Sequence, residues 1–208
     1  MNIVDAVIIV LLIIGALDGV RKGAIKSLVE LVGSILVIFF SWILKGILSN
    51  VMISTLPQIG SNPAISVVIY QVISFIVLLI IFSIIYKVIV GLTDLVERLF
   101  DSTVILGFVS RVLGALVGLI KSYVIMFFAL FILSSFNIGL INNSKVSTYI
   151  LEKTPLITPF VEKTWNTIKN VYNSSNVEES IQKLFENKII TEENMNKIIN
   201  KYNESKSN

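Results

Sequence analysis

The sequence contains no cysteine and no histidine, and only 15% of its 208 residues carry a charge. The missing residue types exclude disulfide bridges, thiolate nucleophiles, Cys/His zinc sites, haem histidine ligands and histidine-dependent catalytic triads. The low charge content is not that of a water-soluble domain, which carries about 25% charged residues. Apolar residues make up 54% of the chain, and the mean hydropathy is +0.84. These values together predict an integral membrane protein, and nothing in the sequence calls for a metal or cofactor.

The charges that are present gather toward the end of the chain. Residues 1–134 contain 14 of the 31 charged residues, whereas the remaining 74 residues contain 17. The lysines are scattered and form no basic block, so we expect no nucleic-acid partner. This distribution predicts an apolar body in the lipid, followed by a more soluble tail.

Four segments of the body are long and apolar enough to be membrane spans. Crossing the hydrocarbon core of about 30 Å requires roughly 20 mostly apolar residues, and the candidates are residues 3–17, 24–48, 64–92 and 103–134. Pro57, Gly60 and Pro63 predict a loop between the second and third spans. We therefore predict an all-α fold, in which a four-helix membrane bundle over residues 1–135 precedes a short amphipathic helical tail.

Basic residues near the ends of the spans indicate the orientation. The connections between spans one and two and between spans three and four carry most of them: Arg21, Lys22, Lys26, Lys87, Arg98 and Arg111. The connection between spans two and three has Lys45 alone, at its edge. Because short loops rich in lysine and arginine stay in the cytoplasm, we expect a multi-pass protein with both termini extracytoplasmic.

Seven ionisable residues are candidate intramembrane polar groups: Asp5, Asp18, Arg21, Lys26, Glu30, Arg111 and Lys121. The charge-free stretches of spans one and two contain 12 and 14 residues, which cover only about 18 and 21 Å. In one interpretation the flanking side chains reach the headgroups. In the other, they form a buried polar cluster with a functional role, in which Asp18 and Arg21, or Lys26 and Glu30, are neighbours on one helical face.

Seven glycines are candidate helix-packing residues: Gly15, Gly19, Gly23, Gly33, Gly107, Gly114 and Gly118. Gly15, Gly19 and Gly23 repeat every four residues, and Ser110 and Ser122 extend the spacing of Gly114 and Gly118. Rows of small residues let two helix backbones approach closely within a membrane. The rows fit packing within one protomer or a seam between copies in a homo-oligomer. Gly23 also suits a turn between spans one and two.

Two groups of motifs carry a resemblance to a known family. The first comprises Asn2-x-x-Asp5, Gly19-x-x-Lys22-Gly23 and Glu30-x-x-Gly33, and the second is Gly107-x-x-x-Arg111-x-x-Gly114-x-x-x-Gly118-x-x-Lys121. In this order they resemble the CvpA (colicin V production) family of bacterial membrane proteins, over roughly residues 1–135. Ser122 stands where that family often has glycine, and it is also small. The resemblance implies a bacterial cytoplasmic-membrane protein without an established biochemical activity, named for a role in producing or exporting a peptide toxin.

The tail divides into an amphipathic helix and linker over residues 136–176, a helical hairpin over 177–203 and a disordered end over 204–208. We expect the first helix to begin at Thr158-Pro159, a capping box at Ser175-x-x-Glu178 to open the second, and the third to begin near Thr191. The segment 181–193 is similar to the short C-terminal hairpin module called SHOCT, although Asn187-Lys188 replaces its usual glycine turn.

The apolar stripes of such short helices need a partner, because each helix is too short to be stable alone. The hairpin fits a contact between two copies of the chain. Alternatively, Phe160 and Trp165 fit the bilayer surface, because aromatic rings favour the interface, or the tail helices stay solvated.

The sequence favours a non-enzymatic function, since it offers no recognisable catalytic chemistry. We expect a scaffold or accessory protein in envelope maintenance or toxin/peptide export, which acts through contacts with the lipid bilayer and with further copies of itself or other membrane proteins. The alternative is a small transporter or channel component that uses intramembrane charges such as Arg111 and Lys121.

Overall fold

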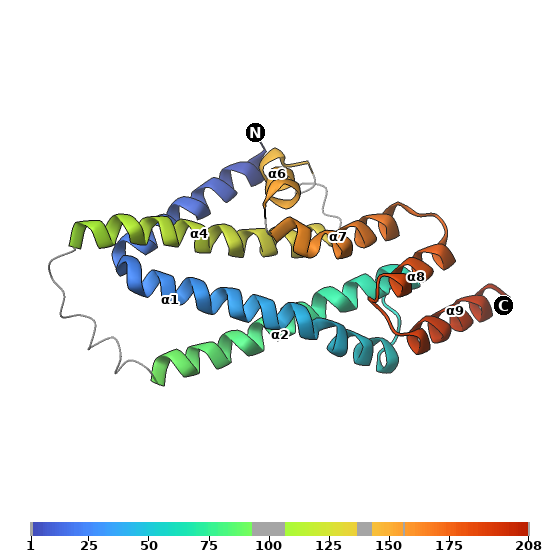
Figure 1. Ribbon diagram of the computed structural model, residues 1–208. Coiled ribbons are helices and arrows are strands. Elements are labelled where there is room, and N and C mark those ends of the chain that lie inside the picture. Colours follow the sequence, from blue (N-terminus) through green and yellow to red (C-terminus); the bar gives the residue numbers. More distant parts are fainter. Residues whose placement is uncertain (1, 93–106, 137–142, 156, 208) are drawn as a thin grey trace.

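The computed structural model describes residues 2–92, 107–136, 143–155 and 157–207, and these contain helices and no strand (Figure 1). The predicted all-α fold is confirmed. The helices are α1 (Ile3–Thr55), α2 (Pro63–Leu92), α4 (Gly107–Ser134), α6 (Lys145–Lys153), α7 (Ile157–Asn173), α8 (Val177–Glu186) and α9 (Glu192–Ser207).

Three described helices are long and apolar enough to cross a membrane: α1, α2 and α4. The first two predicted spans lie in the two parts of the 53-residue α1, which is interrupted at one non-helical residue. That helix bends at Gly23, whose φ of 76° and ψ of 177° are not helical; glycine adopts this φ without the clash a Cβ would cause. The bend divides α1 into an N-terminal arm, residues 3–22, and a long arm, residues 24–55. Each arm has the roughly 20 residues that a crossing needs.

The predicted loop between spans two and three joins α1 to α2. Within it Gly60 has a φ of 76°, the backbone N–H of Ile59 donates to Ser66 Oγ at 3.0 Å, and the Tyr70 hydroxyl donates to the carbonyl of Pro57. At the other end of the bundle, α4 is described from Gly107. The charged residues of the segment 93–106 that entered the orientation argument lie outside the described residues.

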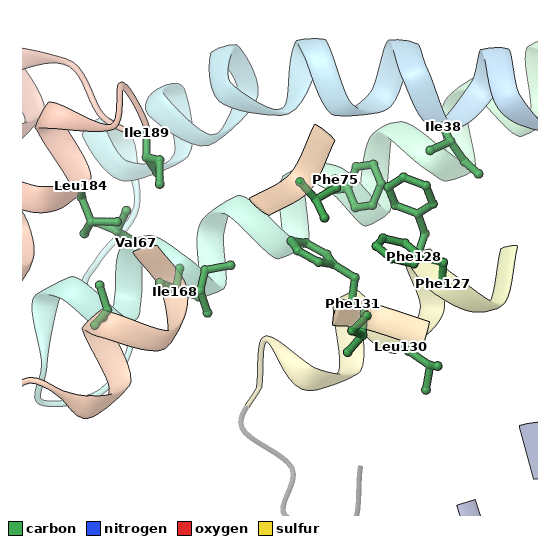
Figure 2. Close-up of a cluster of buried hydrophobic side chains, with 14 of the residues drawn as sticks. Ile38, Val67, Phe75, Phe127, Phe128, Leu130, Phe131, Ile168, Leu184 and Ile189 are labelled. Carbon is green, nitrogen blue, oxygen red and sulfur yellow. The ribbon is translucent and has the colours of Figure 1, made fainter. Parts of the chain in front are cut away.

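An aromatic core joins the long arm, α2, α4 and the tail helix α7 (Figure 2). The Trp42 ring lies edge-on to Phe131 at 5.3 Å and to Phe75 at 5.6 Å between centroids. Phe160 of α7 packs on the same indole at 5.5 Å. Many large apolar side chains of α1, α2 and α4 point outward, which provides the surface that lipid would cover.

The tail helices dock on the membrane helices of their own chain. Ile181 and Leu184 of α8 are fully buried, Gln71 Nε2 of α2 donates to the carbonyl of Ile189 at 2.9 Å, and Asn194 Nδ2 of α9 donates to Asn50 Oδ1 at 2.9 Å. The hairpin's apolar stripe is therefore buried within one chain in this structure, and a contact between two copies through the hairpin stays a prediction. The long arm and α2 extend far enough along the hairpin to bury the stripe within one chain (Figure 1).

The turn between α8 and α9 is a Schellman motif. The N–H of Lys188 donates to the carbonyl of Phe185 at 2.8 Å, and the N–H of Ile189 donates to that of Leu184 at 2.9 Å. Lys188 has a φ of 58°, in the left-handed region that favours glycine. Lysine therefore adopts at this turn a conformation that glycine adopts more readily.

Several boundaries in the tail differ from the prediction. Helix α6 was not expected. Helix α7 begins at Ile157, so Pro159 is its third residue, where its missing N–H still costs no helical hydrogen bond. The cap of α8 is Asn176, whose side chain accepts from the N–H of Glu179, in place of the expected Ser175. Helix α9 continues through Ser207, over residues for which we expected disorder.

Candidate functional site

The N-terminal arm of α1 packs antiparallel on α4 through the two glycine rows. A Cβ built on Gly19 would lie 2.0 Å from the carbonyl oxygen of Gly114, and one built on Gly118 would lie 2.4 Å from that of Gly15. Side chains cannot be accommodated at such distances, so backbone lies directly on backbone. The rows named from the sequence meet each other within one chain, as in the intramolecular interpretation.

Serines satisfy the backbone groups that the bend at Gly23 leaves without helical partners. The N–H of Ala24 donates to Ser110 Oγ of α4 at 3.1 Å, and Ser27 Oγ donates to the carbonyl of Gly19 at 3.5 Å. Helix α4 therefore supplies both the glycine surface for the N-terminal arm and a cap for the long arm.

The remaining two candidate packing glycines behave differently. Gly33 faces α2, where an added Cβ would lie 2.2 Å from the Tyr86 ring. Gly107 is the first residue of α4, and an added Cβ there would meet no described atom within 4 Å. The structure therefore does not support a packing role for Gly107 against the described residues, since the glycine contacts begin further along α4.

Four charged side chains form a closed network beside the glycine contact. Lys22 Nζ lies 2.7 Å from Asp18 Oδ2 and 2.9 Å from Glu30 Oε1. Lys121 Nζ lies 2.6 Å from Glu30 Oε2 and 3.3 Å from Asp18 Oδ2. Each carboxylate binds both ammonium groups, and the network has no net charge. It joins the N-terminal arm, the long arm and α4, the three elements that meet at the bend.

The network is partly buried. The Lys121 side chain is 14% exposed and that of Asp18 is 38% exposed, so one end lies deep and the other reaches the surface. Two ammonium groups placed between two carboxylates offset the desolvation of all four. Removing one of the four residues leaves an uncompensated charge in an apolar setting. The network therefore stabilises the bent arrangement of the two α1 arms against α4.

Three of the four network residues, Asp18, Glu30 and Lys121, were among the predicted intramembrane polar groups, whereas Lys22 was not. The predicted neighbour of Asp18 was Arg21, but Arg21 and Arg111 are exposed and make no ion pair with a described residue. Lys26 is also exposed. The sequence could have indicated the Asp18–Lys22 ion pair, since Lys22 lies four residues after Asp18 and therefore on the same side of the helix.

Asp5 lies apart from this network and serves as a double helix cap. Its carboxylate accepts from the backbone N–H of Asn2 at 2.7 Å, from that of Val146 at 3.1 Å and from the Ser144 hydroxyl. It is 1% exposed. The carboxylate thus closes the start of α1 and holds the first turn of α6, where the helix dipole favours negative charge.

Lys45, like Lys22, was not among the seven candidate intramembrane polar residues. It is 8% exposed, and its ammonium lies 3.2 Å from the centroid of the Trp42 ring, a cation–π contact. Among the described residues, no group of three or more carboxylate, histidine or cysteine side chains is placed to hold a metal ion. The chemistry of the site is therefore that of paired charges inside an apolar helical body.

Comparison with known proteins places this architecture in a family. A family model described as colicin V production protein matches residues 4–155. The chain is 25% identical over 174 residues to the uncharacterized transmembrane protein YshB of Bacillus subtilis (strain 168), covering 77% of this chain and 96% of that protein. No solved structure matches. The family match extends beyond the membrane helices to α6, which Asp5 holds against α1. A match over most of the chain, including the bend, the glycine contact and the charge network, shows that the chain belongs to the colicin V production protein family.

Proposed function

We propose that the protein is a non-enzymatic membrane scaffold or accessory factor in envelope maintenance or toxin/peptide export. The observation that carries the proposal is the closed network of Asp18, Lys22, Glu30 and Lys121, in which each charge binds partners from its own chain. Charges used in this way hold helices together. The name of the family supports a connection with toxin production.

The tail gives such a scaffold a surface for partners. Its apolar stripe is anchored to α1 and α2, while polar residues such as Gln182, Glu186 and Lys201 remain exposed. A polar surface at a fixed position on a membrane body is suited to reversible contacts with other proteins. The proposed occupant of this surface is another membrane or envelope protein.

The proposed location is the bacterial cytoplasmic membrane, with both termini outside. The basic residues Arg21, Lys22 and Lys26 lie around the bend, at the same end of the bundle as the start of α4, and α8 and α9 lie at the opposite end (Figure 1). The positive-inside rule assigns the end with the bend to the cytoplasm.

A small transporter or channel component is the second candidate. It is favoured by the exposure of Asp18, which brings the network to the surface. Carboxylates within a membrane are also common members of ion and proton pathways.

A compensated variant separates the two functions. It neutralises all four network residues at once: Asp18→Asn, Lys22→Met, Glu30→Gln and Lys121→Met. The matched control is Lys121→Met alone, which leaves an excess carboxylate. We expect the control to lose about 1–3 kcal/mol of stability, less than a fully buried pair would lose, because the network is partly exposed. The compensated variant should stay folded.

The readouts are photocrosslinking in cells from a probe at Gln182 and ion flux through proteoliposomes containing the purified protein. A scaffold predicts the same crosslinked partners for the wild type and the compensated variant, and no proton or potassium flux above that of protein-free vesicles. Flux through the wild type that the compensated variant lacks would overturn the scaffold in favour of the transporter.

A further inference from the structure

A cavity of about 290 Å³ is lined by residues from the end of α4, from α6 and from α7. Its polar lining includes Ser134, Ser147, Glu152, Trp165, Lys169 and Tyr172. The Tyr172 hydroxyl already donates to the carbonyl of Ser135 at 2.7 Å, so that side chain is fixed in place. None of the residues that line the cavity belongs to the charge network, and most of them lie in the tail helices α6 and α7.

Three residues that line this cavity each have a buried polar atom without a hydrogen-bond partner among the described residues. These atoms are Ser134 Oγ, Ser147 Oγ and Trp165 Nε1, and within the described part of the chain the only other such atom is Ser49 Oγ. Ser134 is 5% exposed and Ser147 is 1% exposed. A buried polar group without a partner costs about 1–3 kcal/mol. Three of them around one cavity indicate a ligand with acceptor atoms, since the indole N–H can only donate.

The rim adds one charge of each sign. Lys169 Nζ lies 3.0 Å from Glu152 Oε1, and the two side chains are 43% and 45% exposed. An exposed ion pair of this kind contributes little stability, so it can open at low cost to bind a ligand. A ligand with both an anionic and a cationic group would replace both halves of the pair.

The size and surroundings of the cavity indicate a headgroup. Its volume is at the lower end of the range of small-molecule sites, which suits a polar headgroup better than a whole lipid. Leu133, Phe136 and Tyr149 are exposed nearby in sequence, at the end of α4 and in α6. Exposed aromatic rings beyond the end of an apolar helix are typical of the membrane interface, where headgroups are found.

We propose that this cavity binds phosphoethanolamine, as a lipid headgroup or as the free phosphate ester. The phosphate oxygens would accept from the Ser134 and Ser147 hydroxyls and from Trp165 Nε1, with Lys169 supplying positive charge. The ammonium group of the ligand would bind Glu152. The proposal is independent of the scaffold function, because it uses none of the network residues.

The test measures ligand binding to the full chain in detergent by native mass spectrometry. The lipid probes are phosphatidylethanolamine and phosphatidylglycerol, and the soluble probe is phosphoethanolamine. The variant Ser134→Ala/Ser147→Ala/Trp165→Phe removes the three donors. Ser49→Ala is the matched control, because it removes an equally buried unpartnered hydroxyl outside the cavity.

We expect the wild type and Ser49→Ala to prefer phosphatidylethanolamine over phosphatidylglycerol. The triple variant should bind the preferred probe at least about tenfold more weakly, from the loss of several hydrogen bonds, and Glu152→Gln should abolish the preference. Trp165→Phe alone removes the indole N–H but keeps an aromatic ring at this position. It should weaken binding by about two- to tenfold, and it tests the proposal even if the triple variant does not fold.

Binding of soluble phosphoethanolamine as tight as that of the lipid would identify the free ester as the ligand, and binding of the lipid alone would identify the headgroup. Equal binding of both lipids by the wild type would overturn the proposal. So would Trp165→Phe binding as tightly as the wild type.

Discussion

Replacing Gly118 with alanine adds one methyl group at the contact between α4 and the N-terminal arm of α1. The new Cβ would lie 2.4 Å from the carbonyl oxygen of Gly15 and 2.9 Å from the Cα of Gly19. Both neighbours are backbone atoms and cannot rotate away, whereas ordinary van der Waals contact begins at 3.4 Å. The two helices would therefore have to separate locally by about 1 Å, which forfeits up to half of the dispersion attraction at the contact.

Two effects of opposite sign decide the outcome. Overpacking costs about 1–3 kcal/mol, whereas alanine gains about 1 kcal/mol over glycine from helix propensity. The net destabilisation of Gly118→Ala is therefore up to about 2 kcal/mol. Gly46→Ala isolates the second effect, because Gly46 is also within a helix and an added Cβ there meets nothing within 4 Å; we expect it to stabilise the protein by about 1 kcal/mol.

The assay is unfolding of the purified protein in mixed micelles by titration with sodium dodecyl sulfate, followed by far-ultraviolet circular dichroism. The decisive quantity is the difference between the two alanine variants, expected to be about 1–3 kcal/mol. If Gly118→Ala proves as stable as Gly46→Ala, the backbone contact between the glycine rows does not hold the helices as we argue.

Two further predictions concern the caps. Asp5→Ala should detach α6 from α1, because it leaves the Ser144 hydroxyl and the Val146 N–H without their acceptor, at a cost of about 1–3 kcal/mol each. Amide hydrogen exchange over residues 145–153 should therefore accelerate. Asp5→Asn keeps one acceptor oxygen and should restore part of the protection. Unchanged exchange in Asp5→Ala would contradict the double cap. Lys188→Gly should stabilise the α8–α9 hairpin by about 1 kcal/mol, because glycine adopts the left-handed conformation without strain; slower exchange over α8 is the expected result, and faster exchange would refute it.

Local patterns in the sequence were sufficient to predict the spans and the residues of the glycine contact. Apolar length located α2 and α4, and four-residue spacing identified Gly15, Gly19, Gly114 and Gly118, because a span must be apolar and a close contact must be small. The same patterns do not show that the glycine row of the N-terminal arm packs on the glycine row of α4. Gly23 was predicted to suit a turn between the first two spans, but the geometry of that turn depends on Ser110, which caps the long arm from a distant segment.

The features that sequence reasoning missed depend on distant partners. Helix α6 has nine residues and little apolar character, so its stability depends on Asp5 rather than on its own propensity. Lys22 was overlooked because its second partner, Glu30, becomes a neighbour only after the bend. The sequence did not indicate that the hairpin stripe packs on its own chain, because periodicity does not show that the long arm continues beyond Lys45 and provides the docking surface.

The charge network also constrains the order in which the chain can assemble. Lys121 is 103 residues beyond Asp18, so both carboxylates enter the bilayer long before the ribosome has synthesised their deepest counter-ion. During that interval Lys22 is the only network cation available to Asp18 and Glu30, so the three network residues of α1 carry a net charge of −1. Arrival of α4 removes this imbalance and covers the glycine surface in the same step, which makes insertion of the last span the event that commits the membrane body to its final form.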